Sequence, residues 1–100
     1  MTSQNNNDKD KIIIEVGEKI DISTSDSFKE EVLSYICEGY QQIVLDFSKV
    51  EMIDSFGLGK ILLLNKELND RGGELKIINV TSDYVKKMFD IIHLNNIIDM

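Results

Sequence analysis

The chain has 100 residues, a formal net charge of −7, 42% hydrophobic residues and 29% charged residues. This length predicts one domain with a modest core, and this composition is typical of a soluble globular protein. The acidic balance disfavours nucleic acid and anionic membrane surfaces as partners. No apolar run is long enough to cross a bilayer, and the first residues do not form a secretory signal. We therefore expect no membrane insertion and a cytoplasmic location.

Cysteine and histidine each occur once, as Cys37 and His93. A single cysteine cannot form an internal disulfide, and its place in a helical pattern predicts a half-buried core thiol. One histidine is too few for most histidine-rich metal sites. Asp21 and Asp54 could form a general-base pair, but acidic residues at strand ends are usually caps or solvated. We expect no enzymatic activity, no metal site and no cofactor.

The first part of the chain predicts a tail followed by strands. Residues 1–10 are dominated by polar side chains and predict a flexible polar tail. Residues 11–100 predict a single domain. Its first segment, 11–16, is a β-branched run typical of a strand, and after a glycine the strand extends or restarts over 19–22.

The middle of the chain alternates between helical and extended patterns. N-cap residues at 23–26 open an amphipathic helix that Gly39 closes. The apolar run 43–47 predicts a buried strand, and 52–54 predicts a short extended piece. A second helix is expected from Ser55, its natural N-cap, to about Asp70.

The last third continues the alternation. Residues 75–80 predict a strand, Ser82 caps a further amphipathic helix, and 97–98 predict a final edge strand. Alternating strands and helices favour an α/β layer fold, in which helices cover a sheet.

The most distinctive feature is the turn Asp54-Ser55-Phe56-Gly57-Leu58-Gly59, between a strand and a helix. It places a hydroxyl at a helix N-terminus, where free N–H groups and the helix dipole stabilise negative charge by about 0.3–1 kcal/mol. Its two glycines allow the backbone to approach its neighbours closely. Ser55 could therefore carry a phosphate. The alternative is that Ser55 only caps the helix and the glycines ease packing.

Several segments in this order resemble the STAS family, the anti-sigma factor antagonists of bacteria. The resemblance rests on the apolar strand 43–47, the turn 54–59 and the Gly72-Gly73 pair before the next strand. The segments Gly17–Asp21 and Val85–Asp90 add to it. It implies a STAS fold, in which three or four helices pack against a mixed β-sheet of about four strands.

The resemblance also implies a function. The chain would bind an anti-sigma factor that is also a serine kinase, and so release a sigma factor. Phosphorylation of Ser55 would end this binding, and a PP2C-type phosphatase would restore it. The implied partner-binding residues are Asp21, Asp54, Ser55, Phe56, Gly57 and Leu58.

The chain departs from the family pattern at Phe56, where phosphorylated members carry a second hydroxyl. Three readings stay open. Ser55 is the acceptor, or the domain binds without being switched, or Phe56 is an exposed apolar anchor, since aromatic residues are enriched at binding hot spots. Alternatively, Phe56 packs against the sheet edge.

The helix after the turn carries more leucine than one buried face needs. Either Leu63, with Gly59, or Leu64, with Lys60, would point partly outward; alternatively, neighbouring helices cover both sides. An outward apolar face favours a second function, a non-phosphorylated STAS adaptor in a stressosome-like or ABC lipid-transport complex. The chain stops at Met100, before the final helix that family members usually have, so either the fold or the sequence is shortened, or a homodimer or another partner covers the exposed edge.

Overall fold

The computed structural model describes residues 10–100, so the predicted tail lies outside the described residues apart from Asp10. The elements are β1 (Lys11–Glu15), β2 (Lys19–Ile20), α2 (Ser25–Glu38), β3 (Gln42–Asp46), β4 (Met52–Ile53), α3 (Ser55–Asp70), β5 (Glu74–Ile78), α4 (Asp83–Ile91) and the short 3-10 helix η1 (Leu94–Asn96). No helix in this part of the chain has both the length and the apolar character to span a membrane.

The strands form two parallel sheets. One has three strands in the order β1-β3-β5, and the other pairs β2 with β4. Helices connect the parallel strands, as such pairing requires. The predicted α/β STAS fold is confirmed. The sheet differs from the expected mixed sheet because all strand pairs among residues 10–100 are parallel and are divided between two sheets.

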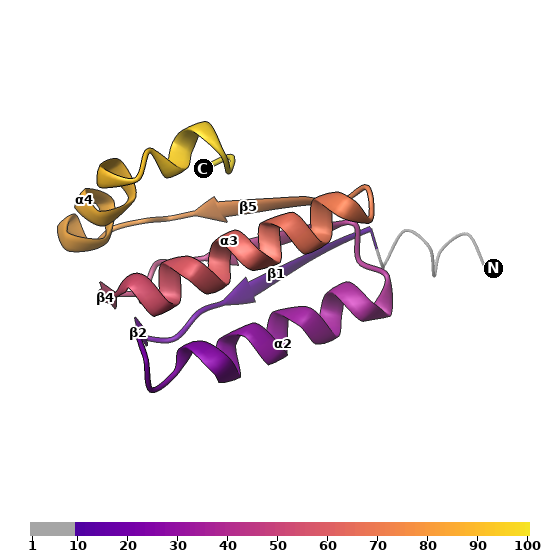
Figure 1. Cartoon of the computed structure of the whole chain (residues 1–100), viewed down its shortest axis with the longest axis horizontal. Coiled ribbons are helices and arrows are strands. Elements are labelled where there is room, and N and C mark those ends of the chain that lie inside the picture. Colours follow the sequence, from indigo (N-terminus) through magenta and orange to yellow (C-terminus); the bar gives the residue numbers. More distant parts are fainter. Residues whose placement is uncertain (1–9) are drawn as a thin grey trace.

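The central strand β3 is buried on both faces, at Ile43, Val44 and Leu45. Helices α2 and α3 lie side by side; α3 lies in front of the strands and α2 along the outer side of β1 (Figure 1). Apolar residues at helical spacing face the core from both helices. They are Phe28, Val32 and Ile36 in α2, and Leu58, Ile61, Leu64 and Leu68 in α3.

Two local expectations are wrong. The chain forms no strand at 97–98; η1 precedes this segment, and only Asp99 makes an isolated parallel bridge, with Lys76 of β5. His93 adopts a left-handed conformation, with φ of 55°, which redirects the chain into a helical turn instead of extending it. Cys37 is exposed, not half-buried, because the buried face of α2 runs through its neighbour Ile36.

Candidate functional site

Asp54, rather than Ser55, is the N-cap of α3. Its backbone is extended, and its Oδ1 accepts a hydrogen bond from Gly57 N at 3.0 Å. Ser55 is therefore the first residue of the helix, and the expectation that it caps the helix is wrong. The side chain of an N-cap accepts from the second or third residue of the helix, and Asp54 stands at the right distance to reach Gly57.

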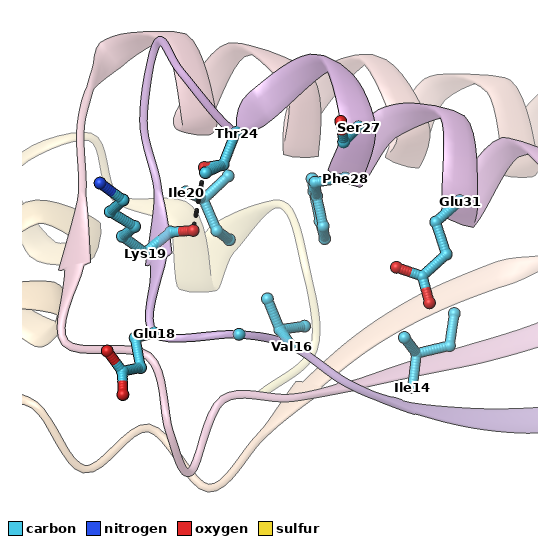
Figure 2. A pocket seen from close by; sticks show the side chains of 10 residues that line it. Ile14, Val16, Glu18, Lys19, Ile20, Thr24, Ser27, Phe28 and Glu31 are labelled. Carbon is cyan, nitrogen blue, oxygen red and sulfur yellow. Dashed lines mark hydrogen bonds between the residues drawn. The ribbon is translucent and has the colours of Figure 1, made fainter.

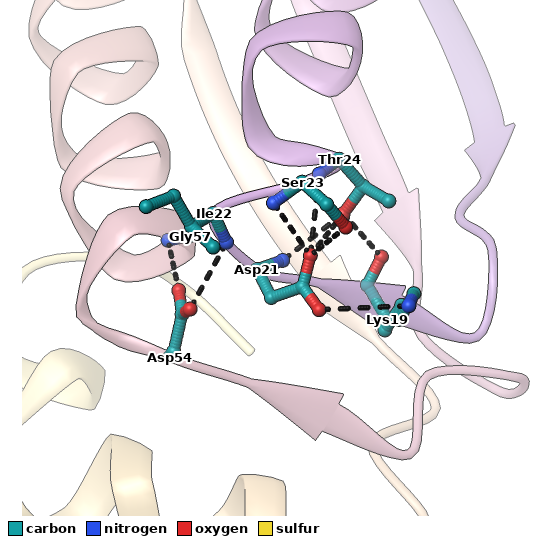
Figure 3. Close-up of polar contacts among 7 residues, drawn as sticks. All are labelled: Lys19, Asp21, Ile22, Ser23, Thr24, Asp54 and Gly57. Carbon is teal, nitrogen blue, oxygen red and sulfur yellow. Dashed lines mark hydrogen bonds and ion pairs between the residues drawn. The ribbon is translucent and has the colours of Figure 1, made fainter.

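The second carboxylate oxygen of Asp54 reaches a different segment. Its Oδ2 accepts from Ile22 N at 3.0 Å (Figure 3). In addition, Asp54 N donates to Ile20 O at 3.2 Å. One side chain thus caps α3 and also holds the loop that follows β2. These hydrogen bonds join the start of α3 and this loop into one corner of the molecule.

Asp21 organises the loop itself. Its carboxylate accepts from Ser23 Oγ at 2.7 Å, Ser23 N at 2.9 Å and Thr24 N at 3.2 Å, and it lies 3.7 Å from Lys19 Nζ (Figure 3). The hydrogen bond from the Ser23 hydroxyl is the main cause that lowers the pKa of Asp21, helped by the Ser23 and Thr24 N–H groups and the charge of Lys19, and opposed by burial. Among residues 10–100 no hydrogen bond joins Asp21 to Ser55.

The two glycines of the turn have different roles. A Cβ on Gly57 would run into the backbone oxygen of Ile20 and would lie 2.9 Å from side-chain atoms of Ile20 and Ile53. A Cβ on Gly59 would meet nothing within 4 Å. Only Gly57 is needed for close approach, because it lets the first turn of α3 pack against β2.

Ser55, Phe56 and Gly59 are the exposed residues of this turn, and Phe56 is 52% exposed. Phe56 therefore does not pack against the sheet edge. Gly57 N and Leu58 N both bond to Asp54, whereas the Ser55 hydroxyl has no hydrogen-bond partner among the described residues. Gly57 and Leu58 are buried in the first turn of the helix, and their contact with a partner stays a prediction.

Further exposed apolar residues continue from Phe56 along α3. Leu63 follows seven residues later on the same side of the helix and is 49% exposed, and Leu62 is also exposed. Leu64 is buried, so Leu63 is the residue that turns outward with Gly59. We call Phe56, Leu62 and Leu63 the α3 patch.

Sequence reasoning missed Ile22, whose side chain is 66% exposed. The hydrogen bond from Ile22 N to Asp54 brings it to the start of α3. The sequence predicts a strand over 19–22 that includes Ile22, whereas β2 ends at Ile20 and leaves Ile22 in the loop that follows. In residues 10–100 no group of three histidine, cysteine or acidic side chains could hold a metal ion.

Comparison with known proteins agrees with this geometry. The model of the STAS domain family matches residues 2–100. A Thermotoga neapolitana protein with a provisional name as an anti-sigma factor antagonist is 30% identical over 91 residues, which cover 90% of this chain and 80% of that protein. An anti-sigma-B factor antagonist of Staphylococcus aureus is 30% identical over 84 residues, covering 84% of this chain and 77% of that protein.

Solved structures share the fold. The anti-sigma factor antagonist SpoIIAA in its unphosphorylated form superposes with a TM-score of 0.77 at 21% identity, over 90% of this chain and 78% of that one. SpoIIAA of Bacillus in its phosphorylated form superposes with a TM-score of 0.69 at the same 21% identity, over 90% and 81% of the two chains. The chain belongs to the STAS domain family, and its relatives at about 30% identity are named anti-sigma factor antagonists.

Proposed function

We propose that the chain is an anti-sigma factor antagonist that binds an anti-sigma factor through the start of α3 and is released by phosphorylation of Ser55. The observation that carries the proposal is the position of Ser55. It is an exposed serine at the first residue of α3, beside the exposed ring of Phe56 and on a corner that Asp54 fixes.

The charges around Ser55 suit a switch. A phosphate adds about −1.5 to −2 charges at neutral pH. Inside the domain, the first turn of α3 stabilises this charge through the helix dipole and free N–H groups. Asp54 stands next to the phosphate, so a partner that fits the unmodified turn would meet a strongly negative, bulkier surface. Phosphorylation should therefore weaken binding far more than it weakens the fold.

The proposed partner is an anti-sigma factor with serine kinase activity, with a PP2C-type phosphatase reversing the modification. The Phe56 ring and the rest of the α3 patch supply apolar contact area, and aromatic residues are common at the centre of such interfaces. The chain's charge of −7 favours a partner that presents basic residues around an apolar centre.

The direct test incubates the purified chain with the anti-sigma factor kinase from the same organism and ATP, followed by mass spectrometry of the peptides. We expect one phosphate, on Ser55, and none on a Ser55→Ala variant. If the kinase binds the chain and modifies a known substrate but leaves Ser55 unmodified, the switch is wrong.

A second function is favoured by the α3 patch alone. Phe56 occupies the position of the second hydroxyl, and an exposed apolar stripe also suits an adaptor that stays bound without being switched, as in a stressosome-like scaffold or a membrane ABC complex. Affinity purification from the native cells separates the two functions. An ATP-dependent kinase in the eluate supports the antagonist, and a multiprotein scaffold or transport ATPase supports the adaptor.

A further inference from the structure

The two edges of the three-stranded sheet differ. The outer edge of β5 is covered at Lys76 and Ile77, because Asp99 pairs with Lys76 and Asp99 O accepts from Ile77 N at 2.9 Å. Within residues 10–100, β1 pairs with β3 on one side only. An uncovered edge presents a row of backbone donors and acceptors to any extended chain that approaches.

The backbone bonds show which groups face outward from β1. Val16 N donates to Asp46 O at 3.0 Å, and Asp10 O accepts from Gln42 N at 2.7 Å, so the even-numbered residues turn their polar groups toward β3. Strand backbone alternates, so the N–H and C=O groups of the odd-numbered residues point away from the sheet. These residues are Lys11, Ile13 and Glu15.

A groove lies at the C-terminal end of this edge, between α2 and the segment that runs from Ile14 to Ile20. Its volume is about 460 Å³, and its apolar floor is formed by Ile14 of β1, by Val16 just after this strand and by Phe28 of α2 (Figure 2). The Ile14 and Val16 side chains point toward α2 (Figure 2). A strand added to β1 would reach this groove at the end of the strand beside Ile14 and Val16.

The rim of the groove is acidic. Glu18 lies at one end and Glu31 of α2 lies at the other, and both are exposed (Figure 2). Neither carboxylate forms a salt bridge within the described part of the chain, whereas the nearby Lys19 is paired with Asp21 at 3.7 Å. Two unpaired negative charges beside an apolar floor select a ligand with basic and apolar side chains.

We propose that the β1 edge is a second binding surface, which receives an extended segment of a partner protein as an added parallel or antiparallel strand. Main-chain hydrogen bonds to Lys11, Ile13 and Glu15 would supply affinity, and the groove would select the side chains that reach it at the Glu15 end of the strand. The segment would direct small apolar residues onto Phe28 and Ile14, and a lysine or arginine toward Glu18 or Glu31. This surface is distinct from the proposed Ser55 site and does not depend on it.

A second copy of the chain suits this edge less well than a peptide does. Helix α2 runs along the outer side of β1 (Figure 1), and a symmetric dimer through β1 would bring the second α2 into the same space. Residues 1–9 of the same chain contain only one apolar residue, Met1, so they offer little to the apolar floor. An extended segment of another protein brings no second α2 into this space, and it can carry the apolar side chains that residues 1–9 lack.

The test uses the full chain, labelled with nitrogen-15, and the capped heptapeptide Lys-Thr-Val-Thr-Val-Thr-Lys, which places valine and lysine on one face. Peptide binding should shift the amide signals of Ile13 and Glu15 and slow their hydrogen exchange at least tenfold. The matched control peptide, with aspartate in place of both lysines, should bind at least tenfold more weakly.

Two variants locate the surface. Ile13→Pro removes the outward N–H while leaving the bonds between β1 and β3, and proline is tolerated at such an edge; binding should be lost. The double variant Glu18→Gln, Glu31→Gln changes only exposed side chains and should weaken the binding of the lysine peptide about tenfold. Its unchanged core amide signals would confirm that the fold is retained.

Three results would overturn the proposal. One is equal binding of the two peptides. Another is wild-type affinity in both variants. The last is an Ile13 amide already protected before peptide is added, because the edge would then be covered by the chain itself or by a second copy. Sedimentation would distinguish these two occupants.

Discussion

Gly57 sets how closely α3 approaches β2, and Gly59 has no such role. We expect Gly57→Ala to destabilise the protein by about 1–3 kcal/mol, because a backbone oxygen of Ile20 blocks the new Cβ. Gly59→Ala should stabilise it by about 0.5–1 kcal/mol, because alanine loses less conformational entropy in a helix. Urea denaturation measures whether the two variants change the unfolding free energy in opposite directions. Equal changes in the two variants would mean that stability does not need the close packing of the first turn of α3 against β2.

The Asp54 carboxylate has two functions that substitutions can separate. Asp54→Ala removes the cap and should cost about 1 kcal/mol of unfolding free energy. Asp54→Asn keeps one acceptor for Gly57 but turns a donor toward Ile22 N, so it should retain most of the stability while loosening the loop.

Hydrogen exchange checks this separation. In Asp54→Asn the Ile22 amide should exchange faster than in the wild type, and amides in the middle of α3 should be unaffected. An Ile22 amide that exchanges at the wild-type rate would show that the Asp54 carboxylate does not hold the loop after β2.

The lowered pKa of Asp21 predicts a pH dependence. Its folded pKa is below its unfolded value of about 3.9, so the ionised form stabilises the fold above that value, and the stabilisation is lost as pH falls through the folded pKa. Below about pH 4, wild-type stability should therefore fall more steeply than that of Asp21→Asn. Denaturation midpoints between neutral pH and about pH 2.5 measure the difference, and parallel curves would exclude this role for Asp21.

For single residues, the sequence identifies the residues of the candidate site more reliably than it predicts the structural role of each one. The turn at 54–59 stands out from residue types alone, but its cap is Asp54 and not Ser55. Serine and aspartate are both good N-caps, so propensity cannot choose between neighbours. The choice depends on Ile22 and Ile20, which lie more than thirty residues earlier and satisfy Asp54 from outside the helix.

At the level of the element, α3 has a buried face and an exposed apolar stripe, and two adjacent leucines distinguish them. Leu64 is 1% exposed and Leu63 is 49% exposed. Leu64→Ala should cost about 2–5 kcal/mol of unfolding free energy, whereas Leu63→Ala should cost less than about 1 kcal/mol. Thermal and urea denaturation test both, and a large loss in Leu63→Ala would show that the α3 patch is structural.

The α3 patch should matter for binding instead. Phe56→Ala should leave the unfolding free energy nearly unchanged, because the ring is 52% exposed, and should weaken the anti-sigma factor complex at least tenfold. Tyr84→Ala, which removes an exposed ring from α4, is the matched control and should bind like the wild type. Titration calorimetry measures both. Equal affinities for the two variants would remove Phe56 from the interface.

The elements themselves follow closely from the sequence where the apolar pattern is strong. The strands at 11–15 and 42–46 and the helices α2, α3 and α4 lie within one or two residues of where the apolar pattern predicts them. The end of the chain does not, because Ile97 and Ile98 are β-branched and alternate between exposed and buried as in a strand, yet the N–H groups of both donate to Leu94 O in the turn of η1. Two residues are too few to show whether a pattern has the period of a strand or of a turn.

For the whole molecule, the order of strands and helices predicts the α/β class, whereas the division into two parallel sheets follows from long-range pairing. Lys19 pairs with Met52, although each lies in a two-residue strand with no pattern of its own. This small sheet carries the corner that holds Asp54. The geometry of the candidate site therefore depends on the part of the fold that local sequence describes least.

The central claim is that negative charge on Ser55 switches off binding. The measurement that tests it most directly is the affinity of the anti-sigma factor for Ser55→Asp and Ser55→Asn, by titration calorimetry at physiological salt. The two side chains have nearly the same size and both suit a helix start, so they differ mainly in charge. We predict that the aspartate variant binds at least tenfold more weakly than the asparagine variant, while their unfolding free energies differ by no more than about 1 kcal/mol. Equal affinities for the two variants would contradict it.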